Sequence, residues 1–164
     1  MKKIYLSVVC LLISIPLIAQ LYVEPEKEVE CSVFLAKEGR GRAQQGLEIW
    51  DDYIFSCEDG GHVNIYDFKS ADPKPVAGFE LASSHPDNHV NNVCFGVETK
   101  RGASFPLLYI TNGKVGSELE WLCFVESITR RGKRFSSEIA QTIELDGSKW
   151  AEKGYVPIFG APSW

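Results

Sequence analysis

Most of this chain alternates apolar and polar residues with a period of two, which is the pattern of half-buried β-strands. We predict two groups of four strands, separated by turn residues. The first group is Leu47–Trp50, Tyr53–Cys57, His62–Phe68 and Val76–Leu81; the second is Val90–Val97, Leu107–Thr111, Leu119–Ile128 and Ile139–Leu145. Residues after the first twenty show no helical period, so we expect an all-β fold.

Turn residues occur at corresponding places in the two groups, namely Asp59-Gly60-Gly61 and Asn112-Gly113. Both combinations are typical of β-hairpin turns. Repetition of four-stranded units at intervals of about 50 residues is typical of β-propellers. We therefore predict a partial β-propeller over residues 46–164, with two antiparallel blades and the start of a third at Gly154–Phe159. Since propellers close with about four or more blades, we expect a C-terminally truncated chain. A small β-sandwich is the alternative.

The N-terminal segment has the organisation of an export signal. Lys2 and Lys3 precede the uncharged, mainly aliphatic run Ile4–Ala19. This pattern predicts a signal peptide over residues 1–20 and an extracytoplasmic location: periplasm, cell surface or secreted. An uncleaved anchor is the alternative, because about 20 apolar residues can span a bilayer. Residues 21–45 are expected to form a tether, with a possible blade-closing strand around Val29–Leu35.

The charge of the chain limits the kinds of partner that are expected. The chain has 17 basic and 22 acidic residues, a net charge of −5, and no extended basic face. Nucleic acid and anionic membrane surfaces are therefore not expected as partners.

Cleavage of the signal peptide would leave four cysteines, Cys31, Cys57, Cys94 and Cys123, which an oxidising compartment permits to form two disulfides. The apolar strand patterns around the last three favour buried free thiols instead.

One polar loop stands out as a candidate ligand-binding site, just before the first strand of the second predicted blade. Its candidate residues are His85, Asp87, Asn88, His89, Asn91 and Asn92. The first strand of a propeller blade lines the central axis, so this loop would lie near one mouth of the channel. Imidazole and carboxylate groups are suitable metal ligands. The spacing of His85 and His89 suits a helix, however, which Pro86 opposes. We therefore predict no metal site, and a hydrogen-bonded loop is the alternative to ligand binding.

Other charged clusters occur in predicted turns and are interpreted as surface features. They are the acidic Asp51, Asp52, Glu58 and Asp59, and the basic Arg130, Arg131, Lys133 and Arg134. Binding of an acidic glycan is the alternative for the basic cluster. The sequence contains no G-x-S-x-G, H-E-x-x-H, phosphate-binding or dinucleotide-binding motif. It therefore predicts no catalytic residue and no cofactor.

Several segments between about Gln44 and Leu145 resemble a known protein family. They are Gln45-Gly46-Leu47, Tyr53–Gly61, Tyr66-Asp67 and Asp87–Gly96. Together they resemble secreted Bacteroidetes proteins of uncharacterised function with a YncE/quinoprotein-like β-propeller. The resemblance implies a propeller and export. It implies neither a quinone cofactor nor any catalytic residue.

Two functions follow as expectations. The first is an envelope-associated binding or scaffold module for a glycan, a peptide or a partner protein. The alternative is a hydrolase or lyase acting on an extracellular polysaccharide. The sequence favours the first, because it offers no candidate nucleophile and no clear acid/base pair.

Overall fold

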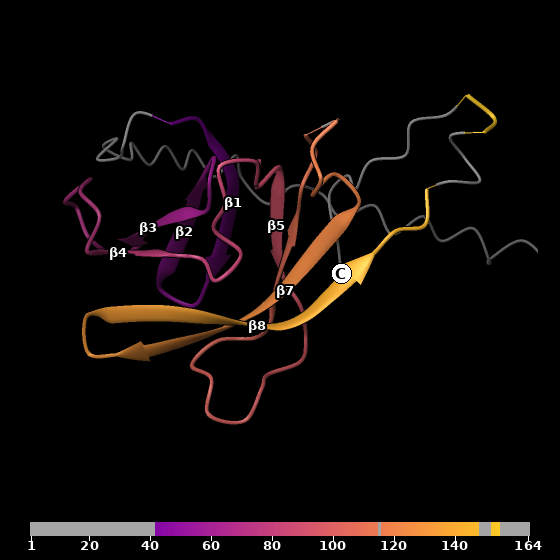
Figure 1. Cartoon of the computed structure of the whole chain (residues 1–164). Coiled ribbons are helices and arrows are strands. Elements are labelled where there is room, and N and C mark those ends of the chain that lie inside the picture. Colours follow the sequence, from indigo (N-terminus) through magenta and orange to yellow (C-terminus); the bar gives the residue numbers. More distant parts are fainter. Residues whose placement is uncertain (1–41, 115, 148–151, 155–164) are drawn as a thin grey trace, which may run out of the picture. The chain divides into compact units, whose positions relative to one another are not determined.

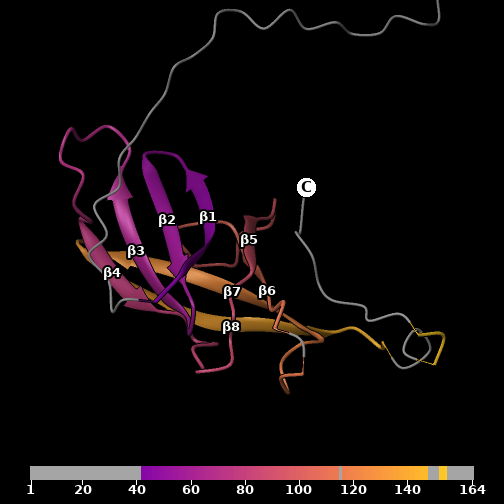
Figure 2. The ribbon, with the colours of Figure 1, turned by 90° about the horizontal axis from the view of Figure 1, so that it is seen from above.

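The computed structural model describes residues 42–114, 116–147 and 152–154, and every regular element within them is a β-strand (Figure 1). The strands are β1 (Gln44–Trp50), β2 (Tyr53–Glu58), β3 (His62–Asp67), β4 (Ala77–Glu80), β5 (Asn92–Phe95), β6 (Leu108–Thr111), β7 (Leu122–Arg131) and β8 (Arg134–Glu144). They form two antiparallel sheets, sheet A with the order β1-β2-β3-β4 and sheet B with the order β5-β6-β7-β8 (Figure 2). The predicted all-β class with two four-stranded meanders is therefore confirmed. These residues contain no helix long and apolar enough to cross a membrane.

The described residues form two sheets but no closed barrel or propeller ring. Several predictions lie outside them: the signal peptide over residues 1–20, the strand around Val29–Leu35, and all of the third-blade segment except Gly154. Those predictions stay predictions.

The β7–β8 hairpin is longer and tighter than predicted. The basic segment Arg130–Arg134 was expected to be a turn, but only Gly132 and Lys133 separate the two strands, and Arg131 pairs with Arg134. Gly132 has a φ of 64°, the conformation that a tight two-residue hairpin turn requires at its first central position. As a result, β8 starts at Arg134 and not at Ile139.

The core lies between the two sheets and is rich in aromatic side chains. Phe55 of sheet A contacts Phe95 and Phe105 edge to face, with ring centroids 5.0 and 5.1 Å apart. Such pairs contribute about 0.5–1.5 kcal/mol beyond the burial of their area. The buried members of this core are Phe55, Cys57, Val63, Ile65, Phe79, Leu81, Val90, Val93, Phe95, Phe105, Leu108, Ile110, Phe124, Ile128 and Phe135. Removing the ring of a residue as central as Phe55 therefore creates a cavity in contact with both sheets.

Corresponding strands of the two sheets lie against each other, β1 against β5 and β4 against β8. Gly46 of β1 makes the first of these contacts possible, because a Cβ there would come within 3.0 Å of both methyl groups of Val93. Face-to-face packing of this kind occurs both between adjacent propeller blades and in a sandwich of two meanders, so it fits either fold. It positions the connections that form the candidate site.

Candidate functional site

Three connections meet at one end of the two sheets, because antiparallel pairing returns β2, β4 and β6 to the same end. They are the β2–β3 turn (59–61), the β4–β5 loop (81–91) and the described part of the β6–β7 loop (112–114 and 116–121). Backbone hydrogen bonds join them: Gly60 N–H donates to the Asn88 carbonyl at 2.7 Å, and Asn91 N–H donates to the Thr111 carbonyl at 2.8 Å. We call this region the polar end.

Glycine is required at the β2–β3 turn. Gly60 and Gly61 have φ values of 86° and 93°, in the left-handed region that favours glycine. A Cβ on Gly61 would also lie 2.8 Å from the Cα of Ser84. The two glycines thus allow the turn and the β4–β5 loop to approach closely.

Asn88 organises the interior of the β4–β5 loop. Its side chain is fully buried, and its amide donates to the Ser83 carbonyl at 3.0 Å. Its side-chain oxygen accepts from Val90 N–H at 3.1 Å. Val90 is buried with a φ of 42°, a costly conformation for a β-branched residue that only a well-determined environment maintains. The loop is therefore held in one conformation by both packing and hydrogen bonds.

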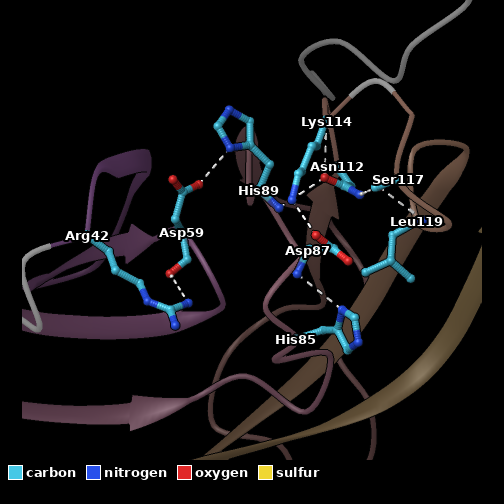
Figure 3. Close-up of polar contacts among 9 residues, drawn as sticks. All are labelled: Arg42, Asp59, His85, Asp87, His89, Asn112, Lys114, Ser117 and Leu119. Carbon is cyan, nitrogen blue, oxygen red and sulfur yellow. Dashed lines mark hydrogen bonds and ion pairs between the residues drawn. The ribbon is translucent and has the colours of Figure 1, made fainter.

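Asn112 connects the β4–β5 loop to the β6–β7 loop. It is fully buried, and its side-chain oxygen accepts from His89 N–H at 3.0 Å and from Lys114 N–H at 3.3 Å. Its side-chain amide donates to the hydroxyl of Ser117 at 3.2 Å (Figure 3). An asparagine that the sequence assigned to a hairpin turn thus supports the backbone of a candidate site residue.

Charged side chains at the polar end are paired across the three connections. His89 Nδ1 lies 2.7 Å from Asp59 Oδ1, although the two groups are not aligned as a hydrogen bond, and they attract as ions when the imidazole is protonated (Figure 3). Arg42 donates to the Asp59 carbonyl at 3.2 Å. Lys114 forms an ion pair with Asp87. Hydrogen bonding to this ammonium and its charge hold the pKa of the Asp87 carboxyl below its usual value.

Two further histidines lie next to these pairs. His62 Nδ1 is 3.0 Å from Glu80 Oε1. His85 Nδ1 accepts from Asp87 N–H at 3.2 Å, which places the proton of the neutral imidazole on Nε2. The Ser84 hydroxyl donates to the Gly60 carbonyl at 2.7 Å, so it is engaged in holding the turn.

Two small pockets open at the polar end and share Arg42, Asp59 and Pro86. The first has a volume of about 200 Å³, and its lining includes Arg42, Asp59, His62, Glu80, Ser84 and His85. The second has a volume of about 290 Å³ and is lined by Arg42, Asp59, Pro86, Asn88, His89 and Lys114. Their walls carry both signs of charge and several hydrogen-bonding groups.

The structure brings together four of the six predicted site residues. His85, Asn88 and His89 line the pockets, and Asp87 is ion-paired at their edge. The other two lie away from the pockets. Asn91 packs so closely on Gly113 that a Cβ there would lie 2.7 Å from its side-chain amide, and Asn92 accepts from Val93 N–H at 2.9 Å.

Four residues of the polar end were not among the predicted site residues: Arg42, Asp59, Asn112 and Lys114. Asp59 was interpreted as a solvated turn residue. The strand pattern did contain a signal for it, because the turn after a second strand and the loop after a fourth strand lie at the same end of a meander. No comparable local signal marked Arg42 or Asn112.

Two fully buried glutamates lie close to the polar end. Glu126 of β7 accepts from Ser83 N–H at 2.8 Å and from Ala82 N–H at 3.0 Å, one bond to each oxygen. Glu58 of β2 accepts from the Asn64 side-chain amide at 2.9 Å, whereas its second oxygen has no partner among the described residues. These carboxylates differ in how well their burial is compensated.

Two thiols in the described part of the chain, Cys57 and Cys123, are free and buried. Burial, and to a lesser extent the nearby Glu126 and Glu48 carboxylates, raise the pKa of Cys57 far above the usual value. Its thiol is therefore chemically inert in the folded protein.

Within residues 42–114, 116–147 and 152–154, no three His, Cys, Asp or Glu side chains are grouped so that they could hold a metal ion. Comparisons with known proteins give no further guidance: no family model and no curated protein matches this chain. The chemistry of the polar end must therefore be argued from its own geometry.

Proposed function

We propose that this chain is an exported binding module of the cell envelope, and that its polar end recognises a short, uncharged segment of a glycan. The observation that carries the proposal is the meeting of His89 and Asp59, 2.7 Å apart, between two pockets that share Arg42 and Asp59. A set of fixed donors and acceptors from three rigid connections is typical of sites that orient a polar ligand.

The balance of charge favours an uncharged ligand. Lys114 is neutralised by Asp87, and Asp59 lies beside both His89 and Arg42. A strongly anionic or cationic ligand would have to displace one of these partners. Sugar hydroxyls both donate and accept hydrogen bonds. They can therefore bond to imidazole, carboxylate and guanidinium groups without displacing any of these charged partners.

The proposed export rests on the N-terminal sequence pattern, in which two lysines precede a long uncharged run. N-terminal sequencing of the mature protein from its host should give Gln20 or Leu21 as the first residue. A mature protein that begins at Met1 would contradict cleavage.

The ligand proposal is tested by titrating the full chain with neutral oligosaccharides, selected first on a glycan array, and measuring affinity by calorimetry. His89→Ala and Asp59→Asn should each weaken binding about tenfold, the effect of losing one hydrogen bond to a charged group. Asn92→Ala is the matched control, since it removes a predicted site residue that lies outside both pockets. Equal losses in the control and in His89→Ala, or no binding by the unchanged chain, would reject the proposal.

A polysaccharide hydrolase or lyase is the second candidate. The observation that favours it is the carboxylate of Asp59, 2.7 Å from Nδ1 of His89, because a nearby carboxylate stabilises an imidazole that takes up a proton as a general base. Turnover on polysaccharide libraries, measured as new reducing or unsaturated ends and lost in His89→Ala, would support it. Binding without turnover would leave only the first function.

A further inference from the structure

The end of the β7–β8 hairpin forms a separate feature, because it extends beyond the rest of sheet B (Figure 1). β6 pairs with β7 only from Cys123 to Glu126, whereas β7 and β8 remain paired to Arg131 and Arg134. Side chains alternate between the two faces of this ribbon. Ile128 points into the core, so Thr129 and Arg131 lie on the face turned away from sheet A.

The ribbon divides the basic cluster into two parts with different environments. The Arg130 guanidinium lies over the ring of Tyr53, 4.8 Å from its centroid, and Arg130 Nε donates to the Gly132 carbonyl at 2.8 Å. Arg130 therefore packs against sheet A by a cation–π contact. Arg131 and Arg134 lie opposite each other on the outward face, and both are exposed.

This arginine pair has no compensating charge among the described residues. Like charges directly opposite each other on two strands are destabilising, and the two-residue turn at Gly132 prevents the strands from separating them. The nearest acidic residue along this face of β8 is Glu138, which pairs with Lys100 at 2.9 Å. Arg131 and Arg134 are thus suited to share one external anion.

A groove of about 550 Å³ runs along this face, next to the arginine pair. Thr129 lies opposite Ser136, so one cross-strand pair of hydroxyls lines the groove. The next pair consists of Ser127 and Glu138, whose carboxylate is ion-paired with Lys100. Hydroxyls both donate and accept hydrogen bonds, which suits the oxygens of a sugar ring as well as those of an anion.

We propose that this groove binds the anionic group of an acidic glycan, either a sulfate ester or a uronate carboxylate. Arg131 and Arg134 clamp the anion, since guanidinium groups bind such oxygens through two parallel hydrogen bonds. The hydroxyls of Thr129 and Ser136 bond to the neighbouring sugar oxygens. A nucleic acid fits less well, because the aromatic residue at the groove, Phe135, is buried in the core and offers no exposed ring on which bases could stack.

The test uses the full chain and two probes, chondroitin sulfate oligosaccharides and polygalacturonate oligosaccharides, with dextran as the uncharged comparison. Affinity is measured by calorimetry at 50 and 200 mM salt. Binding of the sulfated probe alone identifies a sulfate site, and binding of both probes identifies a general carboxylate and sulfate site. Affinity should fall at the higher salt concentration, because exposed charges are screened.

Variants locate the site. Arg131→Gln and Arg134→Gln should each lower the affinity about tenfold. Arg131→Lys should lower it several-fold, because lysine keeps the charge but loses the guanidinium fork. Lys69→Gln is the control: it removes the same charge from an exposed side chain that follows β3 in sheet A. His89→Ala separates this proposal from that for the polar end, since it should leave acidic-glycan binding unchanged.

Failure to fold will not obscure the result, because removing one member of a like-charge pair should raise thermal stability slightly. The proposal is overturned if neither acidic probe binds the unchanged chain. It is also overturned if Lys69→Gln lowers affinity as much as Arg131→Gln, or if dextran binds as tightly as the acidic probes to the His89→Ala variant, in which the polar end is weakened.

Discussion

Sheets A and B have the same strand order, yet each buries a glutamate in a different way. In sheet B, Glu126 faces sheet A and accepts a backbone N–H on each oxygen, from Ala82 and Ser83. In sheet A, Glu58 lies on the face turned away from sheet B, with the amide of Asn64 on one oxygen and no described partner on the other. Two adjacent backbone N–H groups replace the water that Glu126 loses on burial, whereas Glu58 is compensated only in part. The comparison indicates that Glu126 joins the sheets and supports the polar end.

The largest effect is expected from Glu126→Ala. The substitution leaves Ser83 N–H buried without an acceptor and removes two charge-assisted hydrogen bonds between β7 and the β4–β5 loop. We expect the free energy of unfolding to fall by about 3 kcal/mol. Urea denaturation, followed by tryptophan fluorescence, measures this change.

A matched control isolates the role of the carboxylate. Ser137→Ala removes the hydroxyl that also accepts from Ala82 N–H at 2.9 Å, but it leaves Glu126 in place. We expect it to cost less than about 1 kcal/mol. If Ser137→Ala destabilises the protein as much as Glu126→Ala, the carboxylate is not what joins the two sheets.

Glu58→Gln should have a much smaller effect than Glu126→Ala. Glutamine keeps an oxygen for the Asn64 amide and removes a charge that burial penalises. We expect the free energy of unfolding to change by less than about 1 kcal/mol, with either sign. A loss as large as that of Glu126→Ala would show that the Glu58 charge is compensated by a partner outside the described residues.

The strand layout could be predicted because it depends on local signals. Alternation defined the strands, and Asp59-Gly60-Gly61 marked the β2–β3 turn. The burial of Glu126 could not be predicted in the same way. A glutamate at an alternating position normally faces solvent, and its donors, Ala82 and Ser83, are more than 40 residues away in the chain. The sequence contains no local sign of that contact.

For the same reason, only part of the candidate site could be predicted. The loop containing His85 and His89 is recognisable from its composition, but its contact with Asp59 depends on which connections share one end of the sheets. The division of Arg130 from Arg131 likewise depends on the register of β7, which places successive residues on opposite faces. Where a property depends on pairing across the chain, composition alone does not determine it.

The smallest effect concerns Asp87, an exposed carboxylate that contrasts with the two buried ones. Its pKa is lowered in the folded protein by Lys114, so this pair stabilises the fold above the unfolded pKa of about 4. That stabilisation is lost as the pH falls through the folded pKa. Asp87→Asn should therefore lower the melting temperature slightly at pH 7 and leave it unchanged near pH 2.

Salt provides the check on this last prediction. Because Asp87 and Lys114 are both partly exposed to solvent, 0.5 M NaCl should remove most of the difference between Asp87→Asn and the unchanged chain at pH 7. The difference between Glu126→Ala and the unchanged chain should persist in the same salt, because its hydrogen bonds are buried. If salt removed both differences equally, Glu126 would act through long-range charge rather than through fixed hydrogen bonds to the β4–β5 loop, and the contrast between the two sheets would not hold.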